Sequence, residues 1–216
     1  MRPENPSDFS VHVQADKFCL HKFILYECSS LFTQYIREHP ETSEILLTDL
    51  LPTHPMTHWS RDHLHFIFTH MYLSIVPTKA LPVCKPTSPT SIDESLIVLD
   101  IANAFQLDSI GSMLVDTFPF APKAKQEATS TRVKAWSVVR PSRVHTCTDA
   151  FLGLWMAHTF SCISRMTQVR ADCYEVLRYA TEDEIQVGID QSPYAVLLPS
   201  RTYLDLVLLK SLHRNL

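Results

Sequence analysis

Histidines give the sequence its densest set of side chains that could bind a metal ion. Five of the eleven lie between residues 54 and 70: His54, His58, His63, His65 and His70. A zinc site needs several nitrogen, sulfur or carboxylate ligands around one point. Pro55 argues against one helix face presenting both His54 and His58, and no cysteine or paired carboxylate completes a set with His63 and His70. We therefore expect histidines at the surface and at helix ends, and no metal site.

Serine, histidine and aspartate all occur, but not in the spacing of a known catalytic motif. The sequence contains no GxSxG, no HExxH and no glycine-rich phosphate loop. Its 3 glycines leave little material for a backbone cradle around a phosphate. The sequence therefore predicts neither an enzyme nor a bound cofactor.

The cysteines and the apolar runs bear on the cellular compartment. Six cysteines form no CxxC pair, and several fall in apolar patterns where a free thiol acts as a small hydrophobe: Cys19, Cys28, Cys84, Cys147, Cys162 and Cys173. The opening Met-Arg-Pro-Glu does not resemble a signal peptide, and the uncharged run 150–164 is too short to span a bilayer. We expect a cytoplasmic or nuclear protein without a membrane segment.

Charge is unevenly distributed along the chain. The formal net charge is −4, but residues 119–148 carry six basic side chains and one acidic one. A basic stretch could attract an acidic partner. However, its charges are scattered and it lacks a recognition helix and a series of stacking aromatics, so we expect a solvated connector that binds no nucleic acid.

The first residues alternate as strands do. Phe9, Val11 and Val13 alternate with polar residues, which predicts a half-buried strand, and "ADKFCLH" continues it as a hairpin. "EILLTDL" is a candidate third strand. Hydrophobic residues make up 45% of the chain and charged residues 19%, enough for a sizeable core in one domain with or without a smaller companion.

Helical spacing dominates after the hairpin. A first helix begins at Phe23. A second helix over 31–37 is capped by Ser29 or Ser30, and a third helix is capped by Ser60. Two more helices cover 91–106 and "LDSIGSMLVDTF", and prolines mark the loops 51–59 and 76–90. Early strands followed by helices predict an α+β fold. We expect a small sheet and one helical core made of Val11, Val13, Phe18, Leu25, Phe32, Leu64, Ile67, Phe68, Met71, Leu99, Phe105, Ile110, Met113, Leu114 and Phe118.

The last third of the chain is also predicted to be helical. After a proline-containing linker over 119–148, residues 150–166 have the composition of a mostly buried helix. Thr181 and Glu184 form a capping-box pair. Ser200 is expected to cap a final helix with one apolar face made of Leu204, Val207, Leu208 and Leu212.

These motifs, in this order, resemble the BTB/POZ domain. The resemblance covers residues 7–118 and is carried by Ser7-Asp8-Phe9, "FCLHKFILYECSSLF", "SRDHLHFIFTHMYLS" and "LIVLDIANAFQLDSI". It implies a small β-sheet flanked by a helical cluster. Residues 149–216 would then be a short, divergent version of the helical BACK region that often follows a BTB domain.

The resemblance also implies roles for single residues. His21 would tie the strand to the helix at their join, while Lys22 would face Asp8 near a dimer surface. A helix before the first strand, which exchanges across the two-fold in full BTB dimers, is not expected here. The remaining dimer surface would be apolar and formed by Phe23, Leu31 and Tyr35. We therefore expect a weak homodimer, or a monomer that pairs with another BTB chain.

The function implied is protein–protein interaction, as an adaptor or scaffold. In a cullin-based ubiquitin ligase, the chain would contact the cullin scaffold with residues 32–42 and 66–72, including Phe32, Pro40, Glu41, Phe66 and Tyr72, and recruit an unknown substrate protein. The loop "REHPETSE" lacks the hydrophobic-x-Glu element through which many relatives grip a cullin. The alternative is a non-ligase BTB protein that hetero-oligomerises and is linked to transcriptional regulation.

Overall fold

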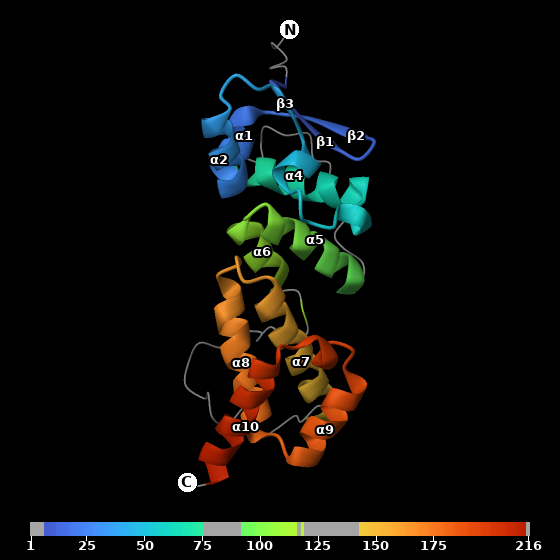
Figure 1. The fold of residues 1–216 in the computed structure, drawn as a ribbon, viewed down its shortest axis with the longest axis vertical. Helices are drawn as coiled ribbons and strands as arrows, with labels where there is room; N and C mark the ends of the chain where they lie inside the picture. Colours follow the sequence, from blue (N-terminus) through green and yellow to red (C-terminus); the bar gives the residue numbers. More distant parts are fainter. Residues whose placement is uncertain (1–6, 76–91, 116–117, 119–142, 215–216) are drawn as a thin grey trace. The chain divides into compact units, whose positions relative to one another are not determined.

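The computed structural model describes residues 7–75, 92–115, 118 and 143–214. The chain forms two compact units, Met1–Gly111 and Ser112–Leu216, which are described separately below as the N-terminal and C-terminal units. The expected loop 76–90 and most of the expected linker 119–148 lie outside the described residues. The fold is α+β, with one small sheet and a large helical majority in the described part of the chain (Figure 1).

Three short strands form a mixed sheet. The strands β1 (Phe9–Val13) and β2 (Asp16–Leu20) are antiparallel, while β3 (Glu44–Leu46) runs parallel to β1 on its other side. Phe9, Val11 and Val13 are buried and the two residues between them are half-buried, which confirms the predicted alternation. The third strand is shorter than "EILLTDL", because the chain turns into helix α3 (Leu47–Leu50).

The hairpin turn uses an unusual backbone conformation. Gln14 has φ 53°, in the left-handed region that non-glycine residues seldom adopt. A positive φ at the first central residue gives a two-residue turn the twist that antiparallel strands need. The Gln14 side chain donates from Nε2 to the carbonyl of Met56 at 3.2 Å, which ties the turn to the loop 51–59.

Two consecutive helices follow the hairpin. They are α1 (Lys22–Cys28) and α2 (Ser30–Glu38), and Ser29 lies between them as the predicted N-cap. The Ser29 hydroxyl accepts a hydrogen bond from the Phe32 N–H at 3.2 Å and donates one to the carbonyl of Phe105 at 2.6 Å. Since Ser29 is only 1% exposed, both bonds are shielded from water.

The remaining helices of the N-terminal unit close its core. A 3-10 turn, η1 (Met56–His58), lies in the predicted loop and precedes α4 (Arg61–Ile75), α5 (Ile92–Ala104) and α6 (Asp108–Val115). The Ser60 hydroxyl accepts from the His63 N–H at 3.3 Å, which confirms the predicted cap of α4. The division between the two units falls within α6.

Phe105 lies at the centre of this core and is fully buried. Its ring centroid is 5.3 Å from that of Phe32, 5.8 Å from the ring of Trp59 and 6.0 Å from the ring of Phe68. The predicted core residues are buried with one exception. Met113 is 44% exposed, so its predicted inward orientation is wrong.

Helix α5 ends in a Schellman motif without glycine. Leu107 N–H donates to the carbonyl of Ala102 at 2.8 Å, and Gln106 N–H donates to the carbonyl of Asn103 at 3.0 Å. This pairing requires a left-handed residue after the helix, and Gln106 supplies it with φ 56°.

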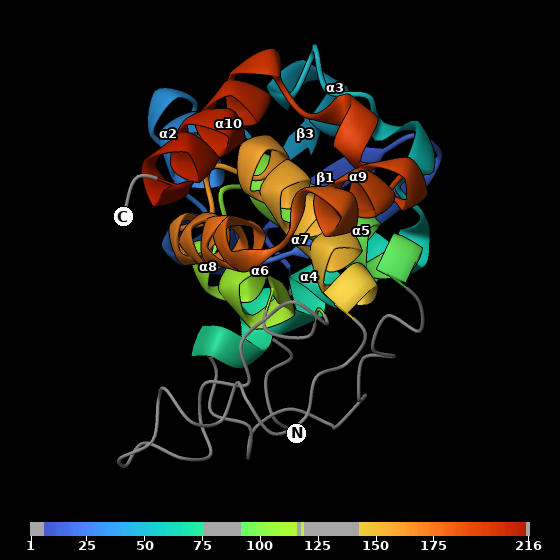
Figure 2. The ribbon, with the colours of Figure 1, turned by 90° about the horizontal axis from the view of Figure 1, so that it is seen from below.

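The C-terminal unit is entirely helical in its described part. It contains α7 (Arg143–Thr159), α8 (Arg165–Tyr179), α9 (Glu182–Gln191), the 3-10 turn η4 (Ala195–Leu197) and α10 (Ser200–Arg214). Figure 2 shows α7 between α8 and α9, with α10 beside α8 on the outside. Helix α7 begins before residue 150 and ends at Thr159, so the prediction of one helix over 150–166 is wrong: α8 starts anew at Arg165.

The predicted helix ends agree in part with this unit. Glu184 N–H donates to the Thr181 hydroxyl at 3.2 Å and Thr181 N–H donates to the Glu184 carboxylate at 2.7 Å, which confirms the capping box. Ser200 is the first helical residue of α10 and not its cap, a correction of one position. The side chain of Leu212 lies outside the described residues.

Candidate protein-interaction surface

His21 joins the end of β2 to the end of α4 through Tyr72. The His21 backbone N–H donates to the Tyr72 hydroxyl at 2.8 Å, and the His21 Nδ1 atom lies 2.8 Å from the same oxygen. The hydroxyl can therefore accept from the backbone and donate its proton to Nδ1. At the strand–helix join, the backbone and the imidazole of His21 thus both bond to one side chain, that of Tyr72. Burial raises the pKa of Tyr72, partly offset by the His21 N–H.

Asp8 and Lys22 meet, but not as an ion pair of side chains. The Asp8 Oδ1 atom accepts from the backbone N–H of Lys22 at 2.7 Å. Lys22 is the first residue of α1, where N–H groups lack helical partners and the helix dipole favours a carboxylate. Asp8 therefore caps α1, which the sequence reasoning missed.

The ammonium group of Lys22 is directed elsewhere. Lys22 Nζ donates to the carbonyl of Pro40 and lies 5.8 Å from the ring centroid of Phe9. Lys22 thereby fixes the turn that follows α2. Pro40 and Glu41 in this turn are exposed, and the ring of Tyr35 lies 4.7 Å from that of His39 beside it. The turn is thus available to a partner and is held in place by the helix α1.

Two predicted contact residues are buried. Phe32 is fully buried against Phe105, and Phe66 is 6% exposed with its ring 4.0 Å from that of His70. Because both rings are buried, they pack below the surface and do not form part of it. A partner that approached this part of the unit in the described conformation would touch the surrounding residues, including half-buried Leu31 and Tyr35.

Phe23 is the most exposed large apolar side chain among the described residues of the N-terminal unit, at 60%. It borders a hollow of about 310 Å³ whose lining includes Phe23, Glu27, Cys28, Ser74, Leu107 and Ile110. The Cys28 thiol lies 3.4 Å from both the Met71 carbonyl and the Ser74 hydroxyl. Burial raises the pKa of Cys28, so the thiol stays protonated there. An exposed ring beside a hollow of mixed polarity suits the docking of a protein side chain.

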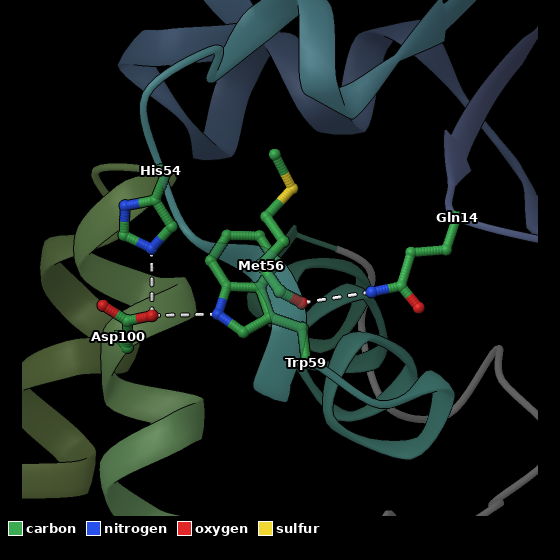
Figure 3. Close-up of polar contacts among 5 residues, drawn as sticks. All are labelled: Gln14, His54, Met56, Trp59 and Asp100. Carbon is green, nitrogen blue, oxygen red and sulfur yellow. Dashed lines mark hydrogen bonds and ion pairs between the residues drawn. The ribbon is translucent and has the colours of Figure 1, made fainter.

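A polar cluster on the loop 51–59 was missed by the sequence reasoning. His54 Nε2 lies 3.0 Å from Asp100 Oδ2, and Trp59 Nε1 donates to the same oxygen at 2.9 Å (Figure 3). The cluster anchors this loop to α5, and the nearby Gln14 bond to Met56 anchors it to the hairpin. His54, considered above as a metal ligand, thus has a structural role. A signal in the sequence was the charged Asp100 within the otherwise apolar run from Leu96 to Ala102.

Within the described residues, no three histidine, cysteine or acidic side chains gather as a metal site. Nor does any helix in that part of the chain combine the length and apolarity needed to cross a membrane. Comparison of the sequence with protein-family models finds no match, and comparison with curated proteins finds no significant one.

Proposed function

We propose that the N-terminal unit is a protein-interaction module of the BTB/POZ type and that the chain is an adaptor or scaffold. The observation that carries this proposal is the bond between His21 and Tyr72. It joins two residues 51 positions apart that belong to two different motifs of the BTB-like sequence. A contact between two separate motifs supports the proposal that they belong to one fold. It is stronger support than the order of the motifs along the chain.

Other contacts of the unit support the same proposal. The expected hairpin, helix pair and closing helices pack as one core around Phe105. Ser29, in the second half of the strand–His–Lys–helix motif, bonds to the carbonyl at the end of α5, which belongs to the fourth motif. Together with the bond from the Lys22 N–H to Asp8 in the first motif, these contacts tie all four BTB-like motifs together through polar side chains.

The partner surface we propose is centred on Phe23. Its exposed ring and the adjacent hollow offer apolar area, while Lys22 and Asp8 fix the start of the same helix. The area is small compared with an obligate dimer interface, which usually buries more than about 2,000 Å². The expected partner is another BTB chain, either a second copy bound weakly or a different chain.

Light scattering over a micromolar concentration series tests this surface. Phe23→Ser should weaken self-association, or pairing with a second BTB chain, by about tenfold or more. Leu46→Ser is the matched control, because Leu46 is 52% exposed on β3 in the same unit and is not part of the proposed surface. Equal effects of the two substitutions would contradict the proposal.

In its more specific form, the adaptor serves a cullin-based ubiquitin ligase. The exposed Pro40 and Glu41 and half-buried Tyr35 would contact the cullin, and an unidentified substrate would be recruited elsewhere on the chain. Calorimetric titration against a cullin N-terminal domain decides between this form and the alternative, a hetero-oligomerising protein linked to transcription. The absence of both binding heat and co-elution at micromolar concentration would exclude the ligase function. The Phe23 surface is tested separately by the light-scattering experiment.

A further inference from the structure

Arg37 in α2 is held against Tyr26 in α1. The Arg37 Nε and Nη2 atoms donate to the Tyr26 hydroxyl oxygen at 2.9 and 2.8 Å. The guanidinium carbon also lies 5.4 Å from the centroid of the Tyr26 ring. The Thr33 hydroxyl donates to the Tyr26 carbonyl, so the backbone of Tyr26 is tied to α2 as well. Two hydrogen bonds and a ring contact therefore fix the orientation of an arginine that is exposed to solvent.

The open edge of this guanidinium has the geometry of a carboxylate site. A guanidinium carries five N–H donors, and the Tyr26 oxygen accepts from the edge formed by Nε and Nη2. The edge formed by Nη1 and Nη2 still presents two parallel N–H groups, which match the two oxygens of a carboxylate. In the described part of the chain, no carboxylate lies within ion-pair distance of Arg37. The adjacent Glu38 carboxylate accepts from Gln34 instead.

We propose that Arg37, held by Tyr26, binds the carboxylate of an aspartate or glutamate side chain on a partner protein. This rests on the proposed role of the N-terminal unit in protein interaction. The charge of the site identifies the group, because a guanidinium without a carboxylate of its own attracts an anion. A carboxylate suits it better than a phosphate, since exposed Glu27 and Glu38 follow Tyr26 and Arg37 in the sequence and repel a doubly charged group more strongly.

The contact with Tyr26 distinguishes Arg37 from an ordinary surface arginine. Exposed ion pairs are usually weak, because two long side chains lose conformational freedom when they pair. Tyr26 already restricts Arg37, so less freedom is lost when the partner binds. Arg61 is the contrast, since its side chain is 72% exposed and its guanidinium lies 3.8 Å from the Asp16 carboxylate. Tyr26 also lies one helical turn after Phe23, so the carboxylate site adjoins the Phe23 surface.

Selection of peptides on the full chain tests the site with a defined probe. A random peptide library is depleted on Arg37→Ala and then selected on the wild type. The selected peptides are synthesised with amidated C-termini, so that only side chains can supply a carboxylate. They should share an aspartate or glutamate, and Arg37→Ala should weaken their binding by about tenfold in fluorescence polarisation. Changing the shared acid to its amide should weaken binding to the wild type equally and have no further effect in R37A.

Three more variants separate the geometry of the site from its charge. Tyr26→Phe removes the oxygen that orients Arg37, and Arg37→Lys keeps the charge without the parallel donors, so each should weaken binding by about threefold or more. Arg61→Ala should leave binding unchanged. Circular dichroism melting should show that all variants keep their fold.

The proposal would be overturned by a selection that yields no Arg37-dependent peptide, or only peptides without a shared acidic residue. Wild-type binding by Tyr26→Phe would overturn the role of the phenol. An unchanged self-association in Phe23→Ser would contradict the Phe23 surface alone, because binding of these peptides does not require pairing of the chain.

Discussion

The carboxylate of Asp8 holds the backbone N–H of Lys22, and not its ammonium group, at 2.7 Å. Asp8 thus satisfies one of the N–H groups that a helix leaves without partners at its start. The ammonium group remains free to bind the carbonyl of Pro40. Lys22 therefore makes two separate contacts: its backbone N–H binds Asp8, just before β1, and its ammonium group binds the turn after α2 at Pro40.

Asp8→Ala should lower the free energy of unfolding by about 1 kcal/mol, the usual cost of losing a helix cap. Asp8→Asn keeps an oxygen acceptor and should cost clearly less. Lys22→Met removes the charge but keeps the backbone donor, so it should loosen the turn at Pro40 with little effect on the cap. Urea unfolding of the three variants measures these differences. If Asn and Ala at position 8 were equally destabilising, the cap would not be the source of the effect.

Phe105→Ala should cost roughly 3–5 kcal/mol, because the ring is fully buried and contacts Phe32, Trp59 and Phe68. Phe23→Ala is the matched control: its ring is 60% exposed, and the change should stay within about 0.5 kcal/mol. Chemical denaturation of both variants measures the difference. An unchanged transition in Phe105→Ala would contradict the core assignment.

Tyr72→Phe should cost about 1–3 kcal/mol, because it removes the oxygen that the His21 N–H donates to and leaves that half-buried group unsatisfied. A double-mutant cycle with His21→Ala separates the side-chain contribution, since that variant keeps the backbone N–H but lacks Nδ1. Additive effects of the two substitutions would show that the imidazole and the hydroxyl are not coupled.

Stability should fall at alkaline pH through Cys173. Burial raises the pKa of this thiol to about 12 in the folded unit. An unfolded chain releases the thiol proton near its ordinary pKa of about 8.5. Between these values the folded state binds the additional proton, so the free energy of unfolding decreases as pH rises, by up to about 1.4 kcal/mol per pH unit.

Urea unfolding at several pH values above 8.5 measures this slope. Cys173→Ala should make the decrease shallower than in the wild type, although Tyr174 and Tyr203, whose pKa values are also raised, leave part of it. Cys162→Ala is the control, because Cys162 is exposed. If the free energy of unfolding fell equally steeply with pH in Cys173→Ala and in the wild type, the pH dependence would not come from Cys173.

Features fixed by neighbouring residues were predictable from the sequence. The alternation of Phe9, Val11 and Val13, the Ser29 cap and the Thr181 capping box depend on residues at most four positions apart, and all three are confirmed. The helix α7 was misjudged because neither glycine nor proline marks its end at Thr159. Met113 was misplaced because α6 is apolar on several sides, so its periodicity does not define an inner face.

Contacts between distant residues were not predictable in the same way. His54 and Asp100 are 46 residues apart, and only the packing of the loop 51–59 on α5 brings them together. For Lys22 and Asp8, the resemblance indicated which residues meet. It did not indicate that the backbone of Lys22 would be the donor, since that depends on where α1 begins relative to the strand.

The two hydrogen bonds of Ser29 have a consequence for how the N-terminal unit folds. The Ser29 hydroxyl accepts a hydrogen bond from the Phe32 N–H and so caps the start of α2. The same hydroxyl donates to the carbonyl of Phe105, 76 residues further along the chain. A hairpin and its first helices can form early from local contacts, whereas this link requires closure of a long loop before any gain is realised. The packing of α5 on the earlier helices should therefore limit the rate of refolding. The unit should unfold in a single cooperative transition.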